Sequence, residues 1–366
     1  MQTSGGETGW WGGAAARFSS RASPARARLA RLGLAAALVA TPVGAGAAGR
    51  ATDEFPTPPA LAPAVRFWID VFTRYSTDDA VIHDRVTPGV VYRVVRVAPG
   101  AAGAPALAAE VQAVADRLAL ASLFGTPGGP RFLLPRVPAD PTGLARLRVQ
   151  RGRRPGIASA LAAHRLYAPT VRRALAAEGL PAALGALPLI ESSYRPGALS
   201  EAGAAGLWQL TPDVARRYIR LAEHRHDPAR ASEAAARHLR ALHQALGSWP
   251  LALTAYNRGL AGVERARRQV GSDDLGIIVQ RYRGHRFGFS ARNFYAQFLA
   301  ARHVLGRRAT YFPEARRTRL VEYEVKRGDT LARVAKRHGV TVGSVRATNG
   351  LRSALLLPGQ RILIQL

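Results

Sequence analysis

Between about residues 150 and 305 the sequence carries one helix boundary after another and no strand-like alternation of apolar and polar residues. The segment Thr211–Asp213 combines an N-cap, a proline suited to the first helical turn and an acidic residue that favours the positive end of the helix dipole. Asp227 and Pro228 repeat this arrangement, and Gly247 suits the end of the helix that follows. The predicted fold class is therefore mainly α, with an all-α domain over residues 150–310.

The composition changes near residue 320, where a different pattern begins. Residues 323–326 alternate as a strand does, and residues 361–364 can pair with them. Two short helical patterns, 330–338 and 341–348, lie between them. Residues 321–366 are therefore predicted to form a small βααβ module, separate from the helical domain.

The chain is strongly basic and has no cysteine. It carries 52 basic and 24 acidic residues, a formal net charge of +28, which favours a polyanionic partner such as nucleic acid, a membrane surface or a cell wall. The absence of cysteine excludes disulfides, cysteine zinc sites, iron–sulfur clusters and thiol nucleophiles. The histidines lack the spacing of metal ligands, so we expect no metal and no cofactor.

The first 48 residues have the order of a signal peptide. Arginines 26, 28 and 31 precede the apolar run 32–43, and small residues 44–48 follow. The apolar run is about a dozen residues, shorter than the roughly 20 that span a bilayer. We expect export to the periplasm or cell envelope, no integral membrane span after leader removal, and a cell wall rather than nucleic acid as partner. A disordered tail and an uncleaved anchor are the alternatives.

Residues 49–149 are expected to form an N-terminal region that packs on the helical domain. A helical stripe of apolar residues covers 105–124, and the Gly- and Pro-rich stretch 125–140 interrupts any regular element.

Three segments of the helical domain carry residues suited to chemistry. Glu191 directly follows the apolar run Leu187–Ile190, where loss of hydration would raise the pKa of its carboxyl group and keep it protonated as an acid. By itself this pattern more often marks a helix end whose carboxylate lies in water. A small-residue turn with Gly203 and Gly206 then leads into Leu207–Leu210, and Ala255–Gly259 places a tyrosine beside an asparagine.

In this order and spacing the three segments resemble the catalytic domain of family 1 lytic transglycosylases, the soluble type with a goose-lysozyme-like all-α fold. The resemblance covers about residues 150–305. The stretch Arg66–Tyr75 looks like the N-terminal region of the membrane-bound lytic murein transglycosylase D subgroup.

The resemblance implies that Glu191 is the single catalytic acid/base. It also implies a set of substrate-binding residues: Ser192, Gln209, Tyr256, Asn257 and Tyr295. The last assignment is open, because the late tyrosine of the family falls at Phe294 or one place later here. Trp208 stands where many members have methionine, which would change the shape of an apolar cleft.

The activity implied is that of a peptidoglycan lytic transglycosylase, a lyase. It would cleave the bond between N-acetylmuramic acid and N-acetylglucosamine and form a 1,6-anhydro ring. A hydrolytic muramidase would need a second carboxylate, and Glu201 is the only acidic residue close to Glu191 in the chain. A non-catalytic peptidoglycan-binding protein is the other alternative, and it would not need Glu191.

The C-terminal module resembles LysM, a domain that binds glycans containing N-acetylglucosamine. Tyr323, the run 328–331, the pair 340–341, the run 349–351 and the run 358–360 fall in the order of that family. The resemblance implies peptidoglycan glycan strands as partner and a groove between loops 328–331 and 355–358. The implied glycan-binding residues are Gly328, Asp329, Thr330 and Leu331, and either Asp329 or Thr330 would cap the first helix. Nothing in the sequence indicates an oligomeric state.

Overall fold

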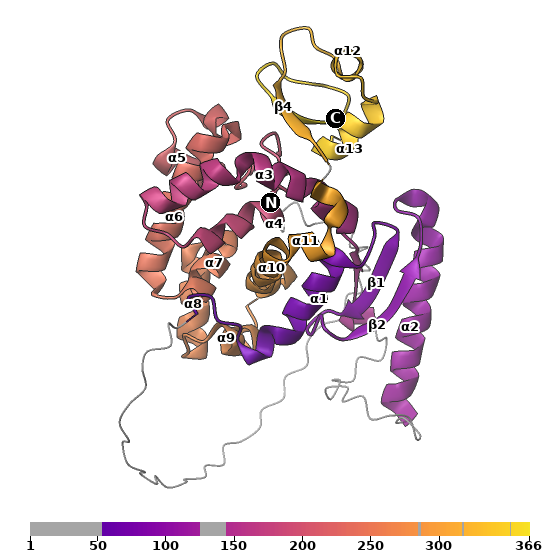
Figure 1. Cartoon of the computed structure of the whole chain (residues 1–366). Helices are drawn as coiled ribbons and strands as arrows, with labels where there is room; N and C mark the ends of the chain where they lie inside the picture. Colours follow the sequence, from indigo (N-terminus) through magenta and orange to yellow (C-terminus); the bar gives the residue numbers. More distant parts are fainter. Residues whose placement is uncertain (1–52, 125–143, 285–286, 317, 352) are drawn as a thin grey trace, which may run out of the picture.

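The computed structural model describes residues 53–124, 144–284, 287–316, 318–351 and 353–366. The expected signal peptide and the expected loop 125–140 lie outside the described residues. Within the described part, helices dominate and the strands are few and short, so the mainly α fold class is confirmed (Figure 1).

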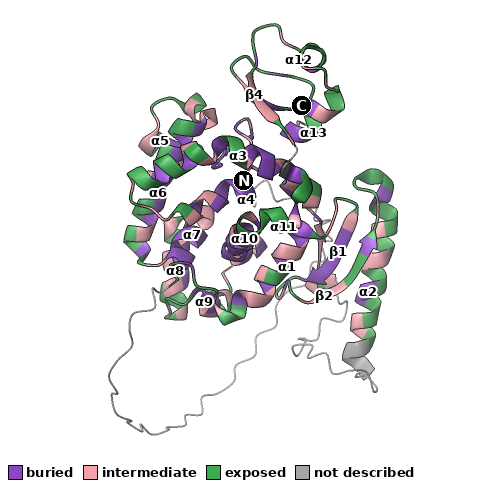
Figure 2. Cartoon of the chain, viewed as in Figure 1, coloured by how far each residue is buried: buried purple, intermediate pink, exposed green. Residues whose placement is uncertain are grey.

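The helical domain is built around α10 (Phe289–Gly306), most of whose side chains are buried. Three helices pack directly against it: α1 (Ala62–Thr73), α4 (Leu187–Glu191) and α7 (Trp249–Arg258). α6 (Pro228–Leu246) packs against both α7 and α3 (Arg154–Ala177). The buried faces of these helices form one continuous apolar core (Figure 2).

Short elements complete the domain, and their ends follow the capping signals of the sequence. They are η4 (Ala182–Ala186), α5 (Pro212–Tyr218), η5 (Ala222–His226), α8 (Leu260–Val270), α9 (Leu275–Arg281), α11 (Arg308–Tyr311) and η6 (Pro313–Arg316). The hydroxyl of Thr211 accepts from the Val214 N–H at 3.4 Å, which caps α5. The Asp227 carboxylate caps α6, and Gly247 ends that helix with a left-handed φ of 65°. The predicted boundaries are confirmed at these positions.

A three-stranded antiparallel sheet flanks the helical domain near α1. Its order is β2 (Val91–Arg96), β1 (Asp79–Asp84), β3 (Leu147–Arg151). The other elements of this region are η1 (Pro59–Leu61), η2 (Ala101–Gly103), α2 (Ala104–Phe124) and η3 (Leu144–Arg146). The sequence did not predict the sheet, because the central strand β1 is buried along almost its whole length and so shows no alternation.

The C-terminal module has the predicted βααβ order. Strands β4 (Leu320–Glu324) and β5 (Arg361–Gln365) pair antiparallel, and α12 (Leu331–Arg337) and α13 (Val342–Asn349) lie between them in the chain. Thr330 caps α12 by accepting from the Arg333 N–H at 3.2 Å. Asp329 instead accepts from the Tyr323 hydroxyl at 2.6 Å and from the Lys326 N–H at 2.8 Å, so Thr330 is the cap.

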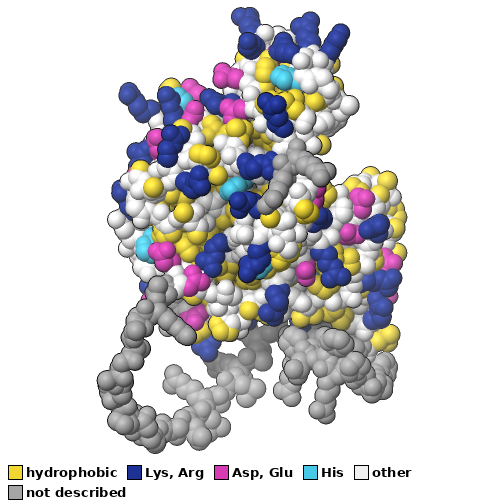
Figure 3. Space-filling view, viewed as in Figure 1, with side chains coloured by type: hydrophobic (Ala, Val, Ile, Leu, Met, Phe, Trp, Pro, Cys, Tyr) yellow, Lys and Arg dark blue, Asp and Glu magenta, His cyan; other side chains and the backbone are white. Residues whose placement is uncertain are grey.

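Basic side chains outnumber acidic side chains on the face of the molecule shown in Figure 3. On the face shown in Figure 3, lysine and arginine are spread over the helical domain and the C-terminal module, with fewer acidic side chains between them. Within the described residues, no helix combines the length and the apolar character that crossing a bilayer requires.

Candidate active site

Glu191 ends α4, and only 6% of its surface is exposed. The helix is short, starts with a proline in its first turn and is buried along its whole length, which takes the carboxyl group into the core. Burial raises the pKa of Glu191 to about 8. Among the described residues, no side chain or backbone group forms a hydrogen bond or ion pair with this carboxyl group. Glu191 is therefore a neutral acid near pH 7, with its proton available to a ligand.

The chain turns sharply directly after Glu191. Ser193 and Tyr194 both adopt left-handed backbone conformations, with φ of 56° and 57°, which cost free energy for residues other than glycine. The Ser192 hydroxyl donates to the Leu207 carbonyl at 2.8 Å and accepts from the Arg195 N–H at 3.2 Å. Ser192 thus fastens the Glu191 turn to the loop of residues 195–210, hereafter the 195–210 loop.

Arg195 is a half-buried residue of this site that sequence reasoning missed. Its guanidinium donates to the Ser192 carbonyl at 2.9 Å, and burial, with the nearby charge of Arg153, lowers its pKa to about 10. A single arginine among 52 basic residues carried no signal that it would lie at this site.

The 195–210 loop is held close to the neighbouring η5. At Gly206, φ is 78°, and a Cβ atom would lie 1.8 Å from the Arg225 carbonyl oxygen, so only glycine fits. Gln209 also has a positive φ, 48°, and its amide nitrogen donates to the Gly206 carbonyl at 3.0 Å. Its Oε1 is buried and has no partner among the described residues. Gln209 therefore presents a fixed acceptor without a donor.

Trp208 belongs to the core rather than to a cleft. Its side chain is fully buried, and the indole N–H donates to the Ser232 hydroxyl of α6 at 2.9 Å. The expectation that Trp208 changes the shape of an apolar cleft is therefore wrong, because the indole points to α6.

Tyr256 joins α7 to this group. Its hydroxyl donates to the Trp208 carbonyl at 2.7 Å. Burial raises the pKa of Tyr256 well above its ordinary value, and the negative charge of Glu191 adds to the effect. Asn257 follows on the same helix and is half-buried. The structure thus brings together the turn after Glu191, the 195–210 loop and the end of α7.

Tyr295 is not brought into this group. It is fully buried in α10, its ring stacks on Phe298, and its hydroxyl donates to the Pro56 carbonyl at 2.9 Å. Phe294 is buried beside it. A substrate-binding role for Tyr295 stays a prediction, and its contacts tie α10 to the N-terminal segment.

In the C-terminal module the four predicted glycan-binding residues have different surroundings. Gly328 is exposed with φ of 85°, Asp329 and Thr330 hold the start of α12, and Leu331 is 3% exposed within the core of the module. Two leucines of the second predicted loop, Leu355 and Leu357, are 70% and 59% exposed. These exposed side chains add apolar surface that the sequence analysis did not single out.

Within the described part of the chain, no group of three histidine or acidic side chains could hold a metal ion.

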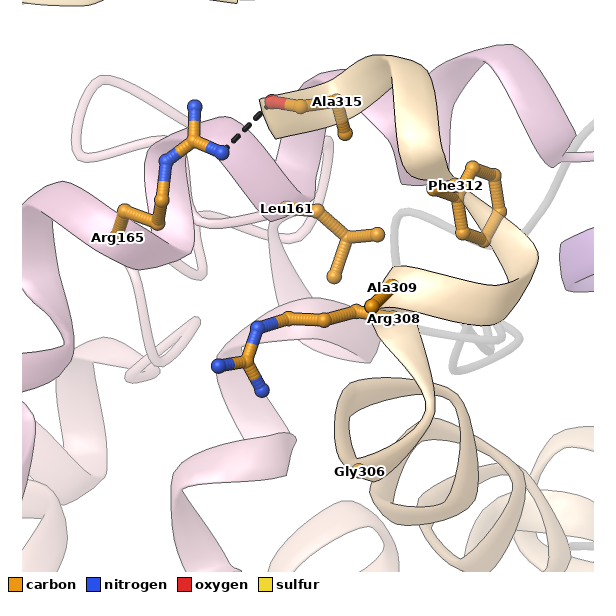
Figure 4. A pocket seen from close by; sticks show the side chains of 7 residues that line it. All are labelled: Leu161, Arg165, Gly306, Arg308, Ala309, Phe312 and Ala315. Carbon is orange, nitrogen blue, oxygen red and sulfur yellow. Dashed lines mark hydrogen bonds between the residues drawn. The ribbon is translucent and has the colours of Figure 1, made fainter. Parts of the chain in front are cut away.

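A depression of about 300 Å³ lies between α3 and the segment after α10, away from the site around Glu191. It is lined by Leu161, Phe312 and two arginines (Figure 4). Arg165 reaches in from α3 and Arg308 from α11. None of the predicted site residues lines it.

Two regions of the chain match sequence models of known protein families. A sequence model of the transglycosylase SLT domain matches residues 171–276, which include Glu191, Gln209 and Tyr256. A sequence model of the LysM domain matches residues 323–365. The two matched regions follow one another in the chain and leave the rest of it unmatched.

Relatives match over part of their length. Membrane-bound lytic murein transglycosylase D of Escherichia coli K12 is 36% identical over 92 residues, which is 24% of this chain and 20% of that protein. A protein of Alteromonas sp. strain M-1 named for tributyltin chloride resistance is 37% identical over 106 residues, 28% of this chain and 51% of that protein. The matches thus span between a fifth and a half of these relatives.

The solved structures that are similar over a limited region include an inactive mutant of lytic transglycosylase Slt from Pseudomonas aeruginosa, which is 20% identical with a TM-score of 0.32. The match covers 39% of this chain and 24% of that chain.

Proposed function

We propose that this protein is a peptidoglycan lytic transglycosylase, and that Glu191 is its single catalytic acid/base. The observation that carries the proposal is the buried, unpaired carboxyl group of Glu191 beside Tyr256, within the matched SLT domain. A carboxylic acid that stays protonated near neutral pH is suited to protonate a leaving oxygen.

In the first step, Glu191 gives its proton to the oxygen between N-acetylmuramic acid and N-acetylglucosamine, and the bond from the muramic C1 to that oxygen breaks. The oxygen of the muramic 2-acetamido group bonds to C1 and carries the developing positive charge. In the second step, the Glu191 carboxylate takes the proton of the C6 hydroxyl, O6 bonds to C1, and the acetamido oxygen leaves. A 1,6-anhydro ring forms, Glu191 regains its proton and no water is consumed.

Hydrolysis with a second carboxylate is the alternative chemistry. It would place a second acidic side chain across the substrate from Glu191. Glu201, the closest acidic residue along the chain, is exposed in the turn before Gly203. A neutral, desolvated Glu191 without a charged partner among the described residues favours the one-carboxylate mechanism.

We assign the remaining parts in keeping with this activity. Residues 1–48 would direct export to the periplasm or cell envelope and be removed, and residues 49–149 would support the catalytic domain, 150–310. The LysM module, 321–366, would bind glycan strands through loops 328–331 and 355–358. The substrate-binding roles of Ser192, Gln209, Tyr256 and Asn257 are part of the same proposal.

The test is digestion of purified sacculi followed by mass spectrometry of the products. We expect anhydro-muropeptides from the wild-type protein and none from Glu191→Gln. Glu201→Gln is the matched control, because it makes the same change nearby on an exposed residue, and it should keep the activity. Products with reducing ends would identify a hydrolase, and the absence of products from the wild-type protein would identify a binding protein.

A further inference from the structure

Strand β5 of the LysM module contributes side chains to two hydrophobic cores. Ile362 and Ile364 of β5 belong to the core of the module, whereas Leu363 between them is 1% exposed and belongs to the core of the helical domain. Successive side chains of a strand point to opposite faces, so β5 presents one face to each core. The module is therefore seated on the helical domain by an apolar contact.

Ion pairs and a hydrogen bond lie next to this apolar contact. The Arg361 guanidinium lies 2.5 Å from the Glu322 carboxylate of β4 and 3.5 Å from the Asp227 carboxylate at the start of α6. The Tyr167 hydroxyl of α3 donates to the other oxygen of Glu322. About a third or less of each of the three charged side chains is exposed. Such a network, partly removed from water, fixes an orientation better than an isolated surface pair.

The same contact reaches the 195–210 loop of the active site. The Arg361 carbonyl lies so close to Gly197 that a Cβ atom there would be 2.6 Å away. From the other side, Arg225 donates to the Gly203 carbonyl at 2.7 Å, and a ring nitrogen of His226 lies 2.9 Å from the Pro196 carbonyl. Asp227, the partner of Arg361, directly follows these two residues. The loop that carries Gln209 is thus held between η5 and β5.

We propose that the LysM module is a fixed wall of the substrate-binding surface, and that Arg361 is a positioning residue for the 195–210 loop. This inference rests on the proposed function. Loop 355–358 of the module lies three residues from Arg361 in the chain. A peptidoglycan strand held by that loop would therefore meet Glu191 at one set position, whereas a tethered module would deliver strands in any register.

Distances between spin labels test the docking directly. The chain has no cysteine, so Val342→Cys on α13 and Arg268→Cys on α8, both exposed, label only the chosen positions. We expect a narrow distance distribution for the otherwise wild-type protein. Arg361→Glu, which faces Asp227 and Glu322 with like charge, and Leu363→Ser, which removes the apolar seat, should broaden it. Lys336→Glu, the same charge change on the exposed face of α12, should leave it narrow. A broad distribution in the wild-type protein would overturn the proposal.

Kinetics test the positioning role. On long glycan strands we expect Arg361→Glu to raise KM several-fold with a smaller change in kcat, and Lys336→Glu to change neither. If the module is released and KM stays unchanged, Arg361 has no positioning role. If the wild-type protein acts on no glycan, the proposed function fails, and the label distances still report whether the module is docked.

Discussion

At the scale of single residues, the candidate site is marked by two polar side-chain groups that lack hydrogen-bond partners among the described residues. Glu191 has a buried carboxyl group, and Gln209 has a buried acceptor, and neither has a hydrogen-bond partner among the described residues. Buried polar groups are normally paired, and each exception calls for an explanation. A sugar that brings hydroxyl and amide donors would supply the missing partners. The sequence pointed to Glu191 through the order and spacing of three segments, not through the apolar run before it alone. The direction of the Trp208 and Tyr295 side chains depends on long-range packing that no local pattern encodes.

The pKa of Glu191 sets the pH range of activity. The first step needs the protonated acid, and burial raises the pKa of Glu191 to about 8. We expect kcat/KM to be level at neutral pH and to fall as the pH rises through about 8. The pH profile of release of soluble muropeptides measures this. A fall centred near the ordinary glutamate pKa of 4.5 would show that Glu191 is not desolvated.

Glu191 should also make stability depend on pH. Its pKa is 4.5 in the unfolded chain and about 8 in the folded protein, so the folded state binds the proton more tightly. The free energy of unfolding should fall as the pH rises between these values, by a few kcal/mol in all. Glu191→Gln removes this term. Its Tm should match that of the wild-type protein near pH 4.5 and exceed it increasingly up to pH 8, and a constant difference across that range would contradict the account.

Loss of the Gln209 side chain tests the acceptor. We expect Gln209→Ala to raise KM on glycan strands several-fold, because the oxygen that would accept from the sugar is lost. The matched variant is Gln297→Ala on α10, a buried glutamine outside the group around Glu191. Unchanged KM in Gln209→Ala would argue against a sugar contact.

At the scale of elements, the site depends on short helices and on one loop held by close backbone contacts. The capping residues Thr211, Asp227 and Gly247 were readable from the sequence because caps act within a few residues. The packing of the 195–210 loop on η5 was not readable, because it joins backbone atoms distant along the chain. The glycine at position 206 indicated a positive φ, but the sequence did not show that the Arg225 carbonyl of η5 leaves no room for a Cβ atom there.

Two glycines of this loop allow the cost of a positive φ to be distinguished from the cost of a steric clash. Gly203 and Gly206 have the same φ, 78°, but a Cβ atom would meet nothing closer than 3.8 Å at Gly203 and lies 1.8 Å from a carbonyl oxygen at Gly206. Gly203→Ala should destabilise the protein by about 1 kcal/mol. Gly206→Ala should cost clearly more and reduce activity, as measured by thermal unfolding and by muropeptide release. Equal effects of the two substitutions would contradict the close packing of the loop on η5.

At the scale of the whole molecule, sequence patterns gave the mainly α fold and the βααβ module but not their association. The association rests on Leu363, which lies in the core of the helical domain, and on Arg361, which pairs with Asp227 at the start of α6 and whose carbonyl lies against Gly197 of the 195–210 loop. Basic side chains are spread over the helical domain and the module (Figure 3), which suits attraction to an anionic cell envelope.

Removal of the module should therefore affect the helical domain itself. A chain that ends at residue 319 loses the Leu363 contact and uncovers the apolar surface beneath it. We expect a lower Tm for the helical domain as well as weaker binding to sacculi. An unchanged Tm would indicate that the module is only tethered.

In the mechanism proposed for Glu191, bond cleavage closes an internal ring without water. Digestion of sacculi in water labelled with the heavy oxygen isotope tests this step most directly, with mass spectrometry of the released muropeptides. We expect anhydro-muropeptides that carry no label. Incorporation of one labelled oxygen at the muramic C1 would show hydrolysis and contradict this mechanism.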